Sequence, residues 1–154
     1  MNKVFNRNNS GKVKVLVILI MITLAFMWGN SLIPGGTSSK MSEWLRDLIN
    51  KIFSFAKSSK EAGSGYLIRK IMHFTEFMIL GIEITCLKYA KKGMNRSMVL
   101  LCGLLAAMID ETIQLFVPGR CGCITDVWLD MAGFFTGFVF LIVIHKLKAW
   151  QIFL

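Results

Sequence analysis

Hydrophobic residues in this sequence gather in long blocks, and polar or charged residues mark where each block ends. Blocks of this kind differ from the periodic stripes of a soluble domain, because a bilayer-spanning helix needs about 20 mostly apolar residues in a row. Four stretches meet this requirement, at residues 15–33, 69–89, 97–116 and 124–145. The pattern therefore predicts an all-α membrane protein, built as a bundle of four transmembrane helices.

The connection between the first two spanning helices, residues 34–68, carries a different pattern. Pro34 and the Gly and Ser residues that follow it end the first helix. From residue 43 to residue 56 the apolar positions recur at a spacing of three to four, opposite polar ones. We predict an amphipathic helix over 43–56, too short and too polar to span, that lies in the membrane interface. Packing against the outer ends of the bundle is an equal alternative.

Charge then sets the expected orientation. The 154 residues are 55% hydrophobic and carry a formal net charge of +9. We expect no nucleic-acid partner, because the basic residues flank apolar blocks, as topology signals and contacts to anionic lipid headgroups do. Residues 1–14 hold basic residues and no acid, and so does the short loop from Lys88 to Arg96. We therefore predict that residues 1–14 and 146–154 are cytoplasmic and that residues 34–68 lie outside.

Several ionisable residues lie within or beside the predicted spanning helices, where a charge is costly and marks a functional-site hypothesis. With both termini inside, these residues fall in the outer halves of their helices and in the outer turn, so they share one leaflet. We predict that they line a polar, ligand-binding cavity open to the external face: His73, Glu76, Asp110, Glu111, Gln114, Arg120, Asp126 and Asp130.

The alternative is a structural network, in which carboxylates pair with His73, Arg69 or Arg120 and only lock the helices together. Some of these residues must do so, because an unpaired buried charge is expensive. The acids in the set outnumber the evident bases, however, so pairing alone would leave carboxylates protonated or unmatched. A ligand-handling site is the better supported of the two interpretations.

Cysteine spacing adds no further site. Cys86 and Cys102 lie within apolar segments, as small buried hydrophobes do, whereas Cys121 and Cys123 form a lone C-x-C in a loop. No second Cys pair or nearby His completes a zinc pattern. We therefore assign no metal ligand, no catalytic residue and no cofactor from the sequence.

The polar residues fall into two blocks that resemble the VanZ-like family of small bacterial membrane proteins. The first block reads Arg69-Lys70-x-x-His73-Phe74-x-Glu76-Phe77-x-x-Leu80-Gly81. The second reads Asp110-Glu111-x-x-Gln114-x-Phe116-x-Pro118-Gly119-Arg120, followed by Asp126-Val127 and Gly133. Their order, spacing and membrane context are specific, although together they cover roughly half of the chain. Asp130 and Cys123 depart from the pattern, since Asn and a Ser-like residue are common there.

The resemblance implies an integral protein of the bacterial cell membrane that acts in the cell envelope. The named member of the family is associated with resistance to the glycopeptide teicoplanin, and most members have no settled reaction. By motif position, the resemblance implies that the signature residues are His73, Glu76, Asp110, Glu111, Gln114, Arg120 and Asp126.

Three functional classes remain open. The favoured one is a non-catalytic factor that binds a membrane lipid, a lipid-linked cell-wall precursor or a lipophilic glycopeptide, with Gln114 and Arg120 bonding its polar groups. The second is an intramembrane enzyme acting on such a lipid, in which His73 serves as general base or holds a divalent ion with two or three acids. The third is a small lipid flippase or transporter, in which Glu83 continues a polar path inward. Glycine-rich helix faces also allow a homo-oligomer.

Overall fold

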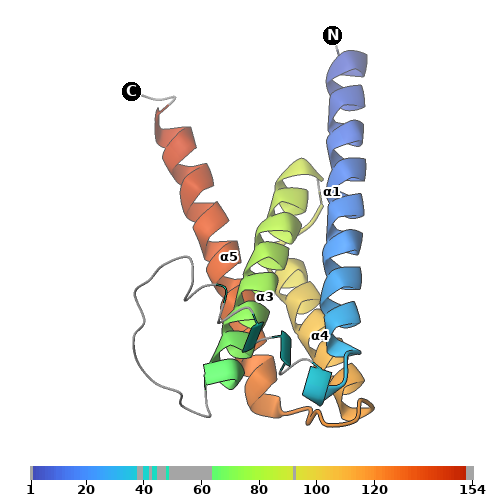
Figure 1. The fold of residues 1–154 in the computed structure, drawn as a ribbon. Helices are drawn as coiled ribbons and strands as arrows, with labels where there is room; N and C mark the ends of the chain where they lie inside the picture. Colours follow the sequence, from blue (N-terminus) through green and yellow to red (C-terminus); the bar gives the residue numbers. More distant parts are fainter. Residues whose placement is uncertain are drawn as a thin grey trace.

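A computed structural model describes residues 2–37, 40–41, 43–44, 48, 64–91 and 93–151. Within these ranges the protein is all-helical and contains no strand. The long helices of the described part are α1 (Asn2–Ser31), α3 (Ser64–Ala90), α4 (Arg96–Leu115) and α5 (Ile124–Gln151). They run alternately up and down, so both termini lie at the same end of the molecule (Figure 1).

Three helices of the described part are long and apolar enough to cross a membrane: Ser10–Ser31 of α1, Arg96–Leu115 of α4 and Ile124–Leu147 of α5. The sequence-based prediction of an all-α protein with membrane-spanning helices is therefore confirmed. The helix α3 falls outside this class because Lys70, Glu76, Glu83 and Lys88 interrupt it. Its 27 residues nevertheless reach about 40 Å, and it packs against each of the other three helices.

The helix bounds differ from the predicted ones mainly at the ends. No proline occurs in residues 2–31, and α1 continues back through the basic segment to Asn2 instead of starting at Val15. Asn95 caps α4, because its side-chain oxygen accepts from the backbone N–H of Met98 at 2.8 Å. Most of the amphipathic helix predicted over residues 43–56 lies outside the described residues.

The closest helix pair is α3 with α5, and glycines allow their backbones to meet. A Cβ atom at Gly133 would lie 2.3 Å from the carbonyl oxygen of Phe74, and one at Gly137 would lie 2.1 Å from that of Met78. The G-x-x-x-G step of α5 therefore faces α3, as small residues do at close helix crossings.

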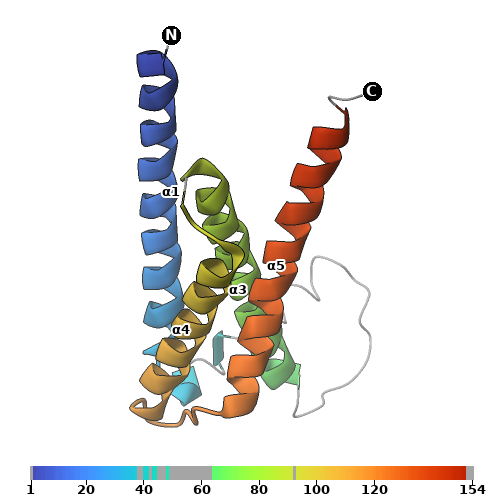
Figure 2. The ribbon, with the colours of Figure 1, turned by 180° about the vertical axis from the view of Figure 1, so that it is seen from behind.

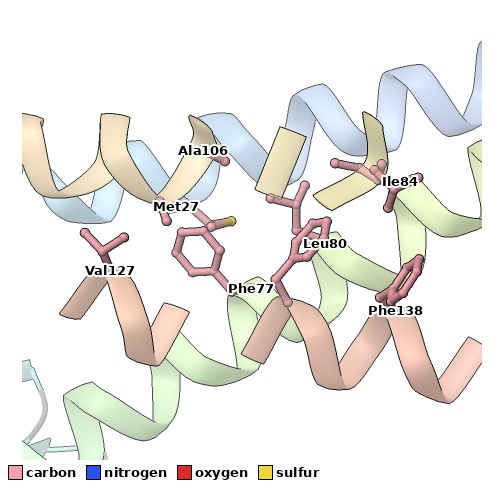
Figure 3. Packing of buried hydrophobic residues seen from close by; sticks show 10 residues of the cluster. Met27, Phe77, Leu80, Ile84, Ala106, Val127 and Phe138 are labelled. Atoms are coloured by element: carbon pink, nitrogen blue, oxygen red, sulfur yellow. The ribbon is translucent and has the colours of Figure 1, made fainter. Parts of the chain in front are cut away.

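A hydrophobic core runs along the bundle, with side chains from all the long helices of the described part. Figure 3 shows Met27 of α1 and Val127 of α5 beside Phe77 of α3, and the cluster continues along α3 past Leu80. Phe77 and Leu80 are fully buried. The outward faces of α1, α4 and α5 expose large apolar residues, as a surface that meets lipid does.

Candidate functional site

The turn between α4 and α5 lies at the end of the bundle where α1 also ends (Figure 2). Pro118 and Gly119 form its corner, closed by a hydrogen bond from the N–H of Arg120 to the carbonyl of Val117 at 3.1 Å. Gly119 has a φ of 73°, a conformation that glycine adopts at little cost at this place in a turn. The Pro-Gly-Arg sequence thus fixes the direction in which Arg120 leaves the turn.

This turn packs directly against the segment that follows α1. The N–H of Gly35 donates to the carbonyl of Pro118 at 3.1 Å, and a Cβ at Gly35 would lie 1.9 Å from the carbonyl oxygen of Gly119. Only a residue without a side chain fits at Gly35. Two glycines far apart in the sequence therefore let the two loops meet.

Arg120 joins the same two parts of the chain. Its Nε donates to the carbonyl of Ile33 at 2.9 Å and its Nη2 to that of Asn30 at 2.8 Å. Burial lowers the pKa of Arg120, with a further lowering by the charge of Arg69, whereas nearby carboxylates act in the opposite direction. The guanidinium thus holds the C-terminal end of α1 against the α4–α5 turn. Its Nη1 is buried without a hydrogen-bond partner among the described residues.

Three polar residues of α4 form a buried network at this end. Gln114 donates through Nε2 to Asp110 Oδ2 at 2.9 Å and to Glu111 Oε1 at 3.1 Å. These contacts follow from helical spacing, because residues three and four apart lie on one face. The hydroxyl of Ser31, at the end of α1, donates to Asp110 Oδ1 at 2.7 Å. Asp110 therefore has donors on both oxygens and is held in one orientation.

The start of α5 is joined to α3 and α4 through two carboxylates. Glu111 Oε2 accepts from the backbone N–H of Cys123 at 2.7 Å, and Lys70 of α3 forms an ion pair with Asp126. The hydroxyl of Thr125 donates to the sulfur of Cys123 at 3.1 Å, and this contact lowers the pKa of the Cys123 thiol. The entry to α5 is thus fixed by side chains from both neighbouring helices.

His73, Asp110 and Asp130 bring one side chain each from α3, α4 and α5 to one point. One nitrogen of His73 and one carboxylate oxygen of each aspartate all lie within 4.8 Å of one another. His73 Nδ1 lies 3.7 Å from Asp110 Oδ2. Asp110 and Asp130 are buried. Asp130 Oδ2 has no hydrogen-bond partner among the described residues.

A cavity of about 270 Å³ adjoins this group. Of the eight residues predicted from the sequence, those that line it are His73, Glu111, Gln114, Arg120, Asp126 and Asp130. Asp110 is absent from the wall and contacts His73 and Gln114 of the lining. Glu76 also does not line the cavity, because it turns toward α1 and accepts from Asn30 Nδ2 at 3.1 Å.

Several residues that line the cavity are not among the eight predicted from the sequence. Arg69, Lys70 and Thr125 line the cavity with Leu129 and residues of the α4–α5 loop. Lys70 precedes His73 by three positions on α3, so helical spacing alone would have placed it on the same side. Ser31 is also outside the predicted set, because its contact with Asp110 depends on how α1 docks.

The wall of the cavity mixes both signs of charge. Arg69, Lys70 and Arg120 supply cationic groups, and three carboxylates face them from α4 and α5. Lys70 and Arg120 already have intramolecular partners. A cavity of this kind offers hydrogen-bond donors and acceptors side by side, which suits a ligand rich in both kinds of group.

The model of the VanZ/LLP1 family matches residues 14–145. The match spans both motif blocks and therefore confirms the resemblance inferred from them. No match was found among curated proteins or among solved structures.

Proposed function

The chain belongs to the VanZ/LLP1 family, and on that basis we propose that it is a multi-pass protein of the bacterial cell membrane that binds envelope lipids. Its ligand is the polar headgroup of a membrane lipid or of a lipid-linked cell-wall precursor. The binding site is the cavity between the N-terminal half of α3, the C-terminal end of α4 and the start of α5.

The observation that carries this proposal is the mixed lining of a polar cavity at the end of an otherwise apolar bundle. A site for a simple anion would present cations alone, whereas this wall carries three basic side chains and three carboxylates. Headgroups that combine phosphate, hydroxyl, amine or amide groups match such a wall. The apolar outer faces of the helices leave room for the acyl or isoprenoid chains beside the protein.

We place α3 across the membrane as a fourth spanning helix. The helices α1 and α4 run in the same direction (Figure 1), so the chain between them must return to the starting side. The polar side chains of α3 turn inward, since Glu83 accepts from Thr23 of α1 at 3.0 Å and Glu76 accepts from Asn30. Ionisable side chains at membrane depth are tolerated when they face the bundle interior in this way.

We infer that the end that holds both termini faces the cytoplasm, because basic residues with few acids flank the helices there. The cavity then opens to the outer leaflet, where lipid-linked wall precursors and lipophilic glycopeptides are found. Binding of such a precursor, or of the drug itself, is how this protein would protect a cell against teicoplanin-type antibiotics.

Asp126→Asn tests the proposal, because it keeps the side-chain shape and removes the charge that faces Lys70 in the cavity. In a teicoplanin-susceptible host, we expect the wild type to raise the drug concentration that stops growth. We expect the variant to lose most of this protection at equal abundance in the membrane. Thr136→Ala, on an exposed face of α5, should protect as well as the wild type.

A second readout follows the lipid itself. Native mass spectrometry of the purified wild type should show a co-purified envelope lipid that is depleted in Asp126→Asn and retained in Thr136→Ala. Equal lipid content in all three proteins, together with equal protection, would contradict binding in this cavity.

An intramembrane enzyme is the second candidate function, and the contact between His73 and Asp110 favours it. A carboxylate beside an imidazole orients it for general-base work. Reconstitution with the co-purified lipid would decide between the two, because an enzyme converts the lipid to a product of different mass while a binding factor leaves it unchanged.

A further inference from the structure

We propose that His73, Asp110 and Asp130 form a binding site for one divalent transition-metal ion, best matched by zinc. The three side chains come from three different helices, and their donor atoms lie within 4.8 Å of one another. This proposal goes beyond the binding of a lipid headgroup, because ion binding at these side chains can be measured without any lipid.

The donor set matches the chemistry of such an ion. One imidazole nitrogen and two carboxylate oxygens are a mixed set that zinc accepts, with bonds of about 2.0–2.2 Å. Two donors on a tetrahedral ion then lie about 3.4 Å apart. His73 Nδ1 and Asp110 Oδ2 are 3.7 Å apart, close to this separation, and the ligand atom of Asp130 lies within 4.8 Å of both.

A second observation, at Asp130, also points to a bound cation. Its side chain is 1% exposed, and Oδ2 has no hydrogen-bond partner among the described residues. Burying a carboxylate oxygen without a partner is costly. Lys70 of the cavity wall forms an ion pair with Asp126. A cation held between Asp130, Asp110 and His73 would give this oxygen a partner and offset two carboxylate charges.

The surroundings of Asp110 resemble the support that metal ligands have. Ser31 donates to Oδ1 and Gln114 donates to Oδ2, and donors of this kind orient a ligating carboxylate. His73 and Asp130 both line the cavity. A fourth coordination position would therefore face the cavity, open to water or to an oxygen of the bound headgroup.

The ion content of the purified protein tests the proposal directly. Cys121 and Cys123 are exposed, and cysteine thiolates are zinc ligands in general, so the measurement uses a Cys121→Ser, Cys123→Ser background to remove them as a second source of bound ion. The full chain in detergent is stripped with a chelator, equilibrated with zinc, freed of loose ion and analysed by mass spectrometry of the metal. We expect one zinc ion per chain.

Two variants and one control locate the ion. Asp130→Asn and His73→Asn should each weaken zinc binding by at least about 100-fold, since outer-shell changes alone cost 10- to 100-fold. Glu83→Gln makes the same acid-to-amide change in α3, outside the cavity lining, and should bind zinc like the background protein. Circular dichroism checks that each variant keeps its helices.

Cobalt gives a readout that does not depend on any variant. Cobalt bound at nitrogen and oxygen donors shows visible bands without the sulfur charge-transfer band that a thiolate site adds.

A background protein that holds no zinc, or zinc binding that survives in both Asp130→Asn and His73→Asn, overturns the metal site. Loss of drug protection in Asp126→Asn does not bear on it, so the two proposals fail separately.

Discussion

At the scale of single residues, the contact between Ser31 and Asp110 joins α1 to the rest of the site. Both side chains are fully buried, and the hydroxyl lies 2.7 Å from Oδ1. Ser31→Ala removes the hydroxyl, so the buried Oδ1 of Asp110 loses this hydrogen bond. We expect the free energy of unfolding to fall by about 1–3 kcal/mol, measured by unfolding in detergent micelles followed by tryptophan fluorescence.

Thr136→Ala is the control for this prediction. The hydroxyl of Thr136 is exposed and donates to the carbonyl of Ala132 in its own helix. Its removal should change the free energy of unfolding by less than about 0.5 kcal/mol. Equal losses in the two variants would mean that the contact between Ser31 and Asp110 adds no stability of its own.

Arg120 allows a structural role to be separated from ligand binding. Arg120→Lys keeps the charge, but one ammonium group cannot replace a planar fork that reaches the carbonyls of Asn30 and Ile33. We expect a loss of about 1–3 kcal/mol in lipid-free detergent. Arg96→Lys, at the exposed start of α4, should leave stability unchanged. If Arg120 served only the ligand, both variants would be as stable as the wild type in the absence of lipid.

At the scale of helices, the contact of α5 with α3 depends on the absence of a side chain at Gly137. Gly137→Ala would place a Cβ 2.1 Å from the carbonyl oxygen of Met78, so the helices must move apart. We expect this strain to lower the free energy of unfolding by about 1–3 kcal/mol, and the thermal midpoint in detergent should fall with it.

Gly29→Ala is the matched control on α1. A Cβ at Gly29 would meet nothing within 4 Å, and alanine favours a helix over glycine by about 1 kcal/mol. The control should therefore be as stable as the wild type or more so. A Gly137→Ala protein that behaves like Gly29→Ala would show that α3 and α5 do not touch at this step.

The helices were predictable because each apolar block carries its own signal. The helix boundaries were less predictable. The predicted first helix began at Val15, whereas α1 begins at Asn2, because residues 2–14 contain no proline that would stop a helix. The bonds of Gln114 to Asp110 and Glu111 follow from local spacing. Partners from other helices do not follow from spacing, because they depend on how two separate elements dock.

Arg120 and Glu76 illustrate that difference. Both were predicted to belong to the cavity, Glu76 because of its charge at membrane depth and Arg120 because of its place in the outer turn. Arg120 lines the cavity, but two of its donors are bound by carbonyls at the end of α1. Glu76 accepts a hydrogen bond from Asn30 and does not line the cavity. A backbone carbonyl has no signature in the sequence, so this use of a guanidinium could not be read from residue types.

At the scale of the whole molecule, the two ends of the bundle differ in chemistry. One end gathers the polar cavity, the α4–α5 turn and the end of α1. Toward the other end, α1 and α5 diverge (Figure 1), and a mostly apolar cavity of about 780 Å³ lies between α1, α3 and α5. A membrane protein with this asymmetry presents its polar site to one face only, so its orientation decides which molecules reach the site.

Cysteine labelling measures that orientation. Cys121 and Cys123 are exposed in the α4–α5 loop, and with both termini in the cytoplasm this loop faces outward. A membrane-impermeant maleimide should therefore label them in intact cells.

In a Cys121→Ser, Cys123→Ser protein, Lys91→Cys places a thiol in the α3–α4 connection, where residue 91 is exposed. That thiol should react only after the cells are opened, because the positive charges around it stay in the cytoplasm. The reverse labelling pattern would turn the cavity toward the cytoplasm and exclude extracellular drugs and precursors as its ligands.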